Sequence, residues 1–238
     1  MRNARSWIVT IAALGLGACA APRPAARAPK YVTPAAFYIP EERLQAIALA
    51  PAPGGDSDTE RQDLAALKDW QAKRTARDCA RADSEANPNY DTFFGSQSPF
   101  SRPMPKEAAE FFAHVRDDAF HITDAIKRKY NRPRPYIEDS SLHPCVPTPK
   151  EDGYAYPSGH ATLSRVFGLV LSDLVPERRA EFMARADEVA LDRVLGGVHH
   201  PSDIAAGKLL GDEIHAELRK IPAFLAELEK IRRLMSRR

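Results

Sequence analysis

Three short stretches of the chain carry side chains that suit phosphate chemistry. Lys127 and Arg134 supply two cations, and Arg193 supplies a third. An arginine offers a planar fork of donors to phosphate oxygens, whereas a lysine acts as a point charge. Asp203 follows His199 by four residues, close enough to hold one ring nitrogen and leave the other free as a nucleophile. These residues predict a site that binds a phosphate and passes its phosphoryl group through a histidine.

The middle stretch, Pro157-Ser158-Gly159-His160, comes directly before an apolar helical run. Ser158 fits a helix N-cap, and Gly159 lets the backbone approach a ligand closely. Free N–H groups at a helix start hold anions well. His160 then projects from the first turn, beside whatever is bound there.

Each stretch by itself also has a simpler structural interpretation. The cations could merely complement the dipole at a helix C-terminus, and Ser158 could cap an ordinary helix with a surface histidine. His200 is an adjacent alternative to His199, but its spacing from Asp203 is less suited to holding the ring. The three stretches are informative because one chain contains all of them in this order.

The combined pattern resembles the signature of the type 2 phosphatidic acid phosphatase (PAP2) superfamily: Lys-x6-Arg-Pro, Pro-Ser-Gly-His and Ser-Arg-x5-His-x3-Asp. The matching residues are Lys127, Arg134 and Pro135, then 157–160, then Arg193, His199 and Asp203. One position departs, because Asp192 stands where the pattern has Ser, and an inward-pointing carboxylate would alter the charge near Arg193. The chain looks most similar to bacterial class A non-specific acid phosphatases.

The resemblance implies an acid phosphatase that hydrolyses small phosphomonoesters; export is expected from the N-terminal segment described below. His199 would attack phosphorus to form a phosphohistidine, and Asp203 would orient His199. His160 would protonate the leaving oxygen and then activate water. No metal or other cofactor is expected, because the cations supply the charge stabilisation. The residues that would hold the phosphate are Lys127, Arg134, Ser158, Gly159 and Arg193.

Other functions use a similar framework. A soluble or tethered phosphatase could act on a lipid head group. Vanadium haloperoxidases hold vanadate in the phosphate position, but those proteins are usually much longer. A non-catalytic phosphate-binding protein would need neither His160 nor His199, so this pair argues against it. A phosphohistidine can also pass its group to an alcohol, which leaves phosphotransferase activity open beside hydrolysis.

Most of the chain has the apolar spacing of helices. Pro105 is well placed to start a long helix, which Pro133 and Pro135 stop. No alternating strand of useful length is present, so the predicted fold class is all-α: a helical bundle with active-site loops between helices. The PAP2/haloperoxidase resemblance implies the same class. The expected helices span 58–86, 104–130, 159–174, 176–195, 201–218 and 222–235.

The N-terminus has the pattern of an export signal, because Arg2 and Arg5 precede a short apolar run. Residues 16–19 resemble a bacterial lipobox, which would make Cys19 the lipidated first residue. Residues 18–20 instead fit a small-x-small cleavage site that would release a free protein. Both alternatives predict a periplasmic protein, lipid-anchored in the first case.

Three segments are expected along the chain: a signal and lipobox region at 1–19, a Pro/Ala-rich linker at 20–56 and a catalytic domain at 57–238. Export permits disulfides, so Cys79 and Cys145 are predicted to form one, with two unpaired buried thiols as the alternative.

The formal charge of +2 falls to about 0 when the two arginines of the signal are subtracted, which gives no argument for nucleic-acid binding. The expected partner is a small phosphomonoester, with membrane contact only through a lipid anchor. Small proteins of this resemblance often pair, so a homodimer is compatible with it.

Overall fold

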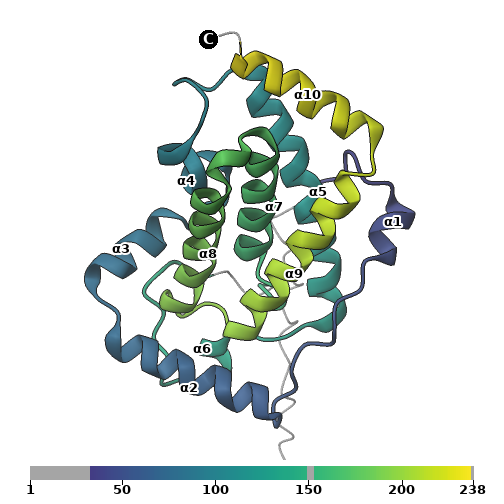
Figure 1. The fold of residues 1–238 in the computed structure, drawn as a ribbon. Coiled ribbons are helices and arrows are strands. Elements are labelled where there is room, and N and C mark those ends of the chain that lie inside the picture. Colours follow the sequence, from purple (N-terminus) through teal and green to yellow (C-terminus); the bar gives the residue numbers. More distant parts are fainter. Residues whose placement is uncertain (1–32, 149–152, 237–238) are drawn as a thin grey trace, which may run out of the picture. The chain divides into compact units, whose positions relative to one another are not determined.

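The computed structural model of the chain describes residues 33–148 and 153–236 (Figure 1). The described residues form helices and loops without a strand, and the predicted all-α class is confirmed. None of their helices is long and apolar enough to cross a bilayer. The predicted signal at 1–19, with Cys19, lies outside the described residues.

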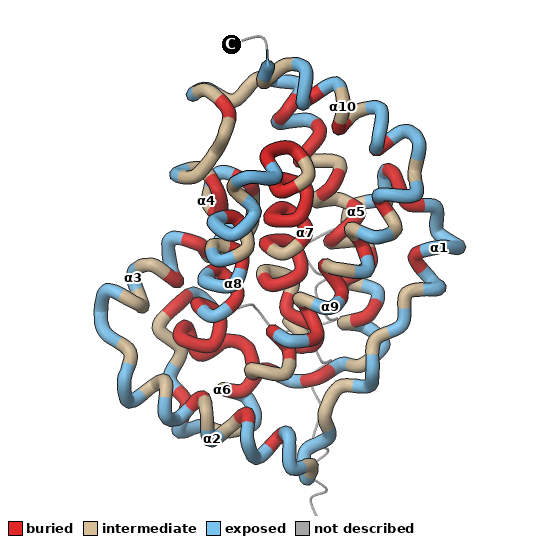
Figure 2. The backbone as a smooth tube through the Cα atoms, viewed as in Figure 1, coloured by how far each residue is buried: buried red, intermediate tan, exposed pale blue. Residues whose placement is uncertain are grey.

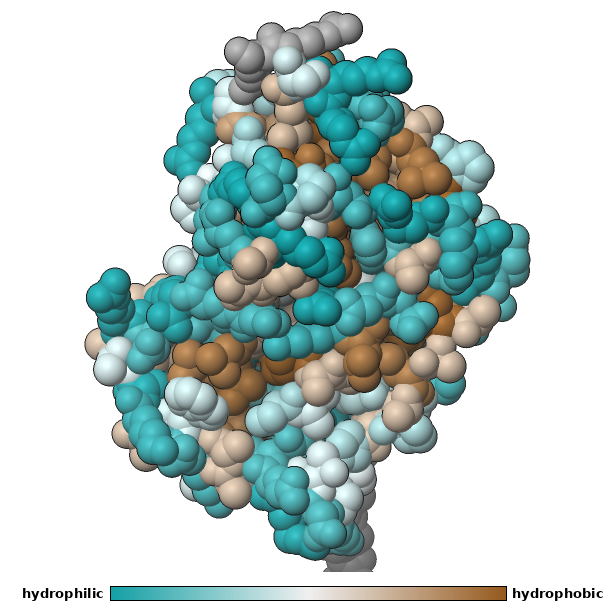
Figure 3. Space-filling model, in the orientation of Figure 1, coloured by the Kyte–Doolittle hydropathy of each residue, from teal (hydrophilic) through white to brown (hydrophobic). Residues whose placement is uncertain are grey.

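Helix α7 (Gly159–Leu174) is the centre of the bundle. It packs against α5 (Lys106–Tyr130), α8 (Arg179–Leu195) and α9 (Pro201–Leu218) (Figure 1). Its side chains are apolar almost all round, which is the composition of a buried helix, and Figure 2 shows it buried along most of its length. Polar side chains cover much of the face seen in Figure 3, with apolar patches between them.

The close approach of α9 to the start of α7 depends on Gly207. A Cβ atom there would lie 2.6 Å from the backbone oxygen of Ser158. The same two segments are joined by a hydrogen bond of 3.0 Å from the Ser158 N–H to the Asp203 carbonyl. The Ser158 turn and the Asp203 turn are therefore held together by backbone contacts, independently of any catalytic side chain.

The predicted helix at 58–86 is two helices, α2 (Asp58–Lys73) and α3 (Ala76–Ser84). The break occurs where Thr75 forms a capping box with Asp78, which favours a new helix start. The predicted helix at 176–195 likewise begins with the 3₁₀ turn η2 (Pro176–Arg178). The remaining predicted helices agree with α5, α7, α9 and α10 (Pro222–Ser236) within a residue or two.

Four short helical segments were not predicted from the sequence. They are α1 (Glu41–Ala46), α4 (Tyr90–Phe94), η1 (Gly95–Gln97) and α6 (Pro135–Glu138). Each is six residues or fewer, so none shows a helical apolar period.

The predicted linker at 20–56 is packed into the core over part of its length. Tyr38, Ile39 and Leu44 are buried there. The carboxylate of Asp118, on α5, accepts hydrogen bonds from the N–H groups of Tyr38 and Ile39. The folded unit therefore starts before residue 57, because a buried acid ties this segment to the bundle.

Cys79 on α3 and Cys145 in the loop after α6 form a disulfide, as predicted, with their Cα atoms 5.6 Å apart. The bond fixes α3 beside the loop that leads from α6 toward α7.

Candidate active site

The residues of the three motifs come together at one end of the bundle. The last turns of α5 and α8 and the first turns of α7 and α9 lie there (Figure 1). The N-terminal ends of α7 and α9 give this region the positive ends of two helix dipoles. All the predicted site residues lie in this region: Lys127, Arg134, Ser158, Gly159, His160, Arg193, His199 and Asp203.

His199 has one ring nitrogen held by a carboxylate and the other by a cation. Its Nδ1 lies 3.4 Å from Oδ2 of Asp203, a long hydrogen bond of the kind that often tightens when substrate binds. Its Nε2 lies 2.7 Å from Nη1 of Arg134. Because a guanidinium can only donate, Nε2 is the acceptor and the proton belongs on Nδ1. The lone pair of Nε2 is thus directed to the place where Arg134 would hold a phosphate.

The carboxylate of Asp203 contacts the rings of two histidines, His199 and His200. Nδ1 of His200 lies 3.0 Å from the same Oδ2, and the backbone N–H of His200 donates to it at 2.8 Å. The expectation that the spacing of His200 suits Asp203 less well is wrong, because a residue just before a helix can fold its side chain toward the third helical residue. Nε2 of His200 contacts Glu138 at 2.9 Å, whereas Nε2 of His199 contacts Arg134. His199 therefore remains the candidate nucleophile.

The charge of His200 follows from these contacts. Burial alone lowers its pKa, but the hydrogen bonds to Asp203 and Glu138 outweigh burial and raise the pKa to about 9. With no ligand other than a proton at Nε2, His200 is thus a cation beside Asp203 at neutral pH.

Arg132, which is not one of the predicted site residues, lies behind the site. It is 3% exposed, and its Nη1 donates to Oδ1 of Asp203 at 2.6 Å. Its Nη2 donates to Glu60 and Asp63 on α2, at 2.7 and 2.9 Å. Asp203 is therefore held on one oxygen by Arg132 and on the other by the histidines. The sequence signal at Arg132 is that it directly precedes a proline within the first motif, as Arg134 does.

The three cations predicted to bind phosphate are buried close to one another. Burial and the nearby Arg134 lower the pKa of Lys127 to about 7. Burial lowers the pKa values of Arg134 and Arg193 to about 10, with the charge of Arg134 adding to the effect on Arg193. Nε of Arg193 is buried without a hydrogen-bond partner. Such a cluster is stabilised by an anion, because each cation is desolvated and lies near other cations.

The turn at Ser158 supplies N–H donors to the same place. Its hydroxyl oxygen accepts from the Ala161 N–H at 3.4 Å, so Ser158 is the N-cap of α7 as predicted. The N–H groups of Gly159 and His160 have no acceptor among the described residues. Two N–H donors at a helix start form an anion-binding turn.

His160 is oriented by the backbone of the segment after α3. Its Nε2 lies 3.0 Å from the carbonyl oxygen of Glu85, so Nε2 donates and Nδ1 is the nitrogen left to exchange a proton. Burial, followed by the charges of Arg193, Arg134 and Lys127, holds the pKa of His160 well below its ordinary value. The pKa of His199 is lowered well below its ordinary value by burial and Arg134.

Asp192, the departure from the motif, does not add its charge to the site unpaired. Its two oxygens accept from Nη2 and Nε of Arg81, on α3, at 2.6 and 2.8 Å. The pair is bidentate, and Asp192 is fully buried. Arg81 was a second residue without a sequence-based role, and nothing in its spacing from Asp192 points to the contact.

Comparison with known proteins places this site within a family. A model described as the PAP2 superfamily matches residues 113–216, which include every predicted site residue. The non-specific acid phosphatase of Salmonella typhi is 32% identical over 206 residues, covering 82% of each chain. That of Salmonella typhimurium is 30% identical over 205 residues, with the same coverage.

Among solved structures, a bacterial vanadium-dependent iodoperoxidase superposes with a TM-score of 0.56 and 21% sequence identity. The match covers 71% of this chain and 51% of that protein. At this identity the similarity shows a shared fold.

Proposed function

The chain belongs to the PAP2 superfamily, and from that premise we propose that it is an exported acid phosphatase that carries the phosphoryl group on His199 as a phosphohistidine. The family and the relatives named non-specific acid phosphatase make it a phosphomonoesterase. The observation that carries the mechanism is the pair of contacts of His199: Nδ1 toward Asp203 and Nε2 toward Arg134.

In the first step, the Nε2 lone pair of His199 attacks phosphorus and the bond to the leaving oxygen breaks. Lys127, Arg134 and Arg193 hold the phosphate oxygens and offset the negative charge spread over them in the transition state. Asp203 stabilises the positive charge that develops on the imidazole of His199. Arg132 and His200 support this role because they fix the carboxylate of Asp203 from both sides.

His160 is the proposed general acid in this step. Its Nε2 is engaged by Glu85, so a proton on Nδ1 would pass to the leaving oxygen. In the second step, a water molecule gives a proton to Nδ1 of His160 and attacks phosphorus. Phosphate and free His199 are released, and His160 has regained its proton. An alcohol in place of water would make the same intermediate a phosphotransferase.

Export is inferred from the N-terminal sequence alone. The basic start and apolar run support a signal, and residues 16–19 support lipidation at Cys19 in the periplasm. Labelling of cells with a radioactive fatty acid tests this part: wild-type protein should carry the label, and Cys19→Ser should not. A homodimer remains a prediction.

A substrate panel tests the proposed function. Nucleotides, sugar phosphates, aryl phosphates and lipid phosphates are offered to the purified protein, with and without excess chelator. Turnover of small phosphomonoesters that persists in chelator is expected, because the proposed chemistry uses the protein's own cations. Turnover confined to lipid phosphates would replace the small-ester substrate class. Loss of turnover with chelator, restored by one divalent metal, would overturn the mechanism.

A further inference from the structure

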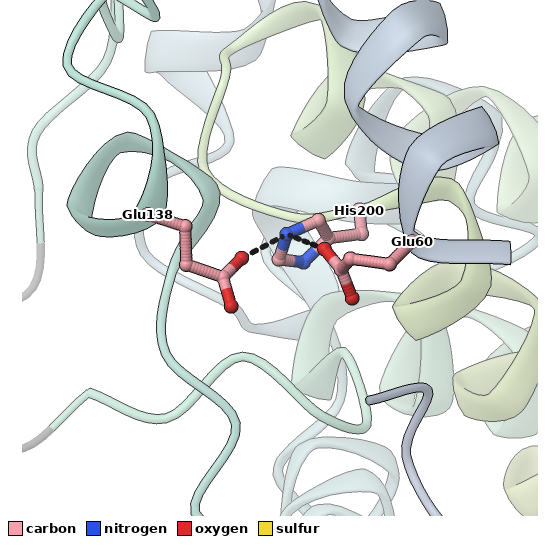
Figure 4. Close-up of side chains that lie close together, drawn as sticks. All are labelled: Glu60, Glu138 and His200. Atoms are coloured by element: carbon pink, nitrogen blue, oxygen red, sulfur yellow. Dashed lines mark hydrogen bonds and ion pairs between the residues drawn. The ribbon is translucent and has the colours of Figure 1, made fainter. Parts of the chain in front are cut away.

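A second cluster of polar side chains lies behind Asp203, and the one part that it has in the proposed reaction is the contact of His200 with Asp203. Glu60 lies in the first turn of α2, Glu138 ends α6 and His200 directly precedes α9. Three elements distant in the sequence thus converge on one imidazole nitrogen, as Figure 4 shows. Among the described residues, this is the group of histidine and carboxylate ligand atoms close enough together to hold a metal ion.

The distances within the cluster fit a small ion. Nε2 of His200 lies 2.9 Å from Oε2 of Glu138 and 3.4 Å from Oε1 of Glu60, and all three atoms lie within 4.8 Å of one another. Ligand atoms of a tetrahedral ion with bonds of about 2.0–2.1 Å are roughly 3.3 Å apart. Small side-chain movements would therefore bring the three atoms around one ion.

An independent observation comes from Glu60. Glu60 is 2% exposed, and its Oε1 is buried without a hydrogen-bond partner. This oxygen points toward Nε2 of His200 (Figure 4). A buried carboxylate oxygen left without a donor is costly, and a metal ion would satisfy it. The other oxygen of Glu60 is bound by Arg132 at 2.7 Å, which fixes the direction of Oε1.

The charge of the surroundings also favours a cation. Four carboxylates belong to the connected network. When Nε2 of His200 is unprotonated, as a metal ligand must be, Arg132 is the cation that balances them within the network. Glu60, Asp63 and Asp203 are almost fully buried, while the side chain of Glu138 is 24% exposed. A divalent ion would offset the excess negative charge, and the partly exposed Glu138 gives it a route from solvent. The network consists of Glu60, Asp63, Glu138, Asp203, Arg132 and His200.

The outer contact of His200 is the one that metal-binding histidines use. Its Nδ1 donates to Oδ2 of Asp203 at 3.0 Å, which leaves Nε2 facing the two glutamates. Carboxylate–histidine–metal chains of this kind fix the tautomer and the orientation of the ring. One nitrogen and two oxygens suit Zn²⁺ and its transition-metal neighbours better than Mg²⁺ or Ca²⁺, which prefer oxygen ligands in larger number.

We propose that Nε2 of His200, Oε1 of Glu60 and Oε2 of Glu138 form a site for one divalent transition-metal ion of the Zn²⁺ type, with a fourth position open to water. The site joins α2, α6 and α9 and contacts the catalytic residues only through Asp203. It does not depend on the proposed phosphatase mechanism, and chelator-resistant turnover is compatible with it. The alternative occupant of the same position is a proton on Nε2.

Zinc titration of the tag-free, chelator-treated protein by calorimetry tests the site. One Zn²⁺ should bind per chain, and the melting temperature should rise with Zn²⁺ because the ion binds the folded chain. Glu138→Gln should weaken the binding by at least about tenfold, because loss of a mere outer-shell partner of a metal site already costs about 10–100-fold. Glu138 is exposed at the end of α6, so this variant should fold.

Glu41→Gln is the matched control, because Glu41 pairs with His121 at 2.8 Å without a third ligand. This control variant should leave the Zn²⁺ affinity unchanged.

Co²⁺ in place of Zn²⁺ should give the visible absorption of a four-coordinate ion in wild type, and this absorption should be lost in Glu138→Gln. Absence of saturable Zn²⁺ binding would leave the proton as the occupant and overturn the proposal. Binding of equal strength in wild type and Glu138→Gln would overturn it as well.

Discussion

Burial and the cations that would hold a phosphate together affect the protonation of both candidate catalytic histidines, His199 and His160. Burial and the charge of Arg134 hold the pKa of His199 well below its ordinary value. The neutral form of His199, whose Nε2 lone pair is available for attack, is therefore favoured. His160 experiences the same cations, and a bound phosphate dianion would offset them and favour the protonated form that a general acid needs. One arrangement of charge thus suits both a nucleophile and an acid.

Substitution of the two histidines should separate these roles. His199→Ala should abolish turnover of p-nitrophenyl phosphate and of an alkyl phosphate alike, because every substrate needs the nucleophile. His160→Asn should reduce alkyl phosphate turnover by roughly 10²–10⁴-fold, the usual contribution of a general acid, and should affect the aryl ester far less. The aryl leaving group departs without a proton. Steady-state rates on both substrates measure the difference.

A trapping experiment identifies the phosphorylated residue. His160→Asn supplied with the aryl ester and quenched without acid should accumulate phosphohistidine, detectable by ³¹P NMR and peptide mass spectrometry. Label on His160 in the wild-type protein, or equal losses on both substrates for both variants, would contradict the assignment.

The pH dependence should show the titration of Lys127. Burial and Arg134 lower its pKa to about 7, so the free enzyme loses this cation as the pH rises through about 7. Because kcat/KM reports the free enzyme, kcat/KM for the aryl ester should fall over that range. Lys127→Arg, measured with the same substrate, should move the fall to higher pH, since an arginine stays charged. An identical profile in both enzymes would show that Lys127 does not titrate there.

At the scale of elements, α3 supports two of the predicted site residues through backbone oxygens at and just beyond its C-terminal end. The carbonyl of Ala82 accepts from Nη1 of Arg193 at 3.4 Å, and that of Glu85 accepts from His160 at 3.0 Å. The helix C-terminus is the negative end of the dipole and so suits donors and cations. The position of α3 is fixed by the disulfide at Cys79 and by the bidentate contact between Arg81 and Asp192.

Loss of the Arg81–Asp192 pair should therefore lower both stability and activity. Asp192→Ala leaves Arg81 without its bidentate partner, and Arg81 is only about one-third exposed. We expect a loss of about 1–3 kcal/mol in the free energy of unfolding and a reduced kcat. Urea unfolding and steady-state kinetics measure the two effects.

The matched control lies on the same helix. Asp187 pairs with Lys208 at 2.8 Å in a solvent-exposed contact, so Asp187→Ala should change stability by less than about 1 kcal/mol and leave kcat unchanged. Equal effects in the two variants would show that the charge of α8, and not the link to α3, is what matters.

The predictable elements were the long ones with clear boundary residues. Pro105, Ser158 and Pro201 mark the starts of α5, α7 and α9, and the structure agrees there. Thr75 and Asp78 had the spacing of a capping box, so the break between α2 and α3 was visible in principle. Helix α6 was not predictable, because its four residues are too few to show an apolar period, and Pro135 is the buried one among them.

The candidate site was likewise predictable only where a local sequence pattern records it. The motif residues could be named from their types and spacing, because phosphate transfer demands cations and a paired histidine. The contacts of Arg132 with Glu60 and Asp63 are made between residues about 70 positions apart, and no local pattern records them. The prediction that His200 is poorly spaced to contact Asp203 was wrong, because this hydrogen bond depends on how the His200 side chain folds over the start of α9.

For the described part of the molecule, the site is a meeting point of segments that are otherwise separate. Lys127 comes from α5, whose Asp118 anchors the N-terminal segment at Tyr38. Arg193 and His199 come from the end of α8 and the loop before α9. A ligand that bridges these groups should stabilise the whole bundle and not one element, because its binding energy adds to the folding energy of every part that must be in place.

Orthovanadate should therefore act on both activity and stability. A five-coordinate vanadate on Nε2 of His199 imitates the transition state of phosphoryl transfer, so it should inhibit competitively and more tightly than phosphate. At a concentration of 100 times its dissociation constant it should add about 2.7 kcal/mol to the free energy of unfolding. In His199→Ala, vanadate can still contact Arg134 and Arg193, but the nitrogen that completes its five-coordination is missing. Its affinity should then fall to that of phosphate. If vanadate binds wild type no better than phosphate, or if His199→Ala keeps the difference between the two anions, attack by His199 is not the reaction that this site performs.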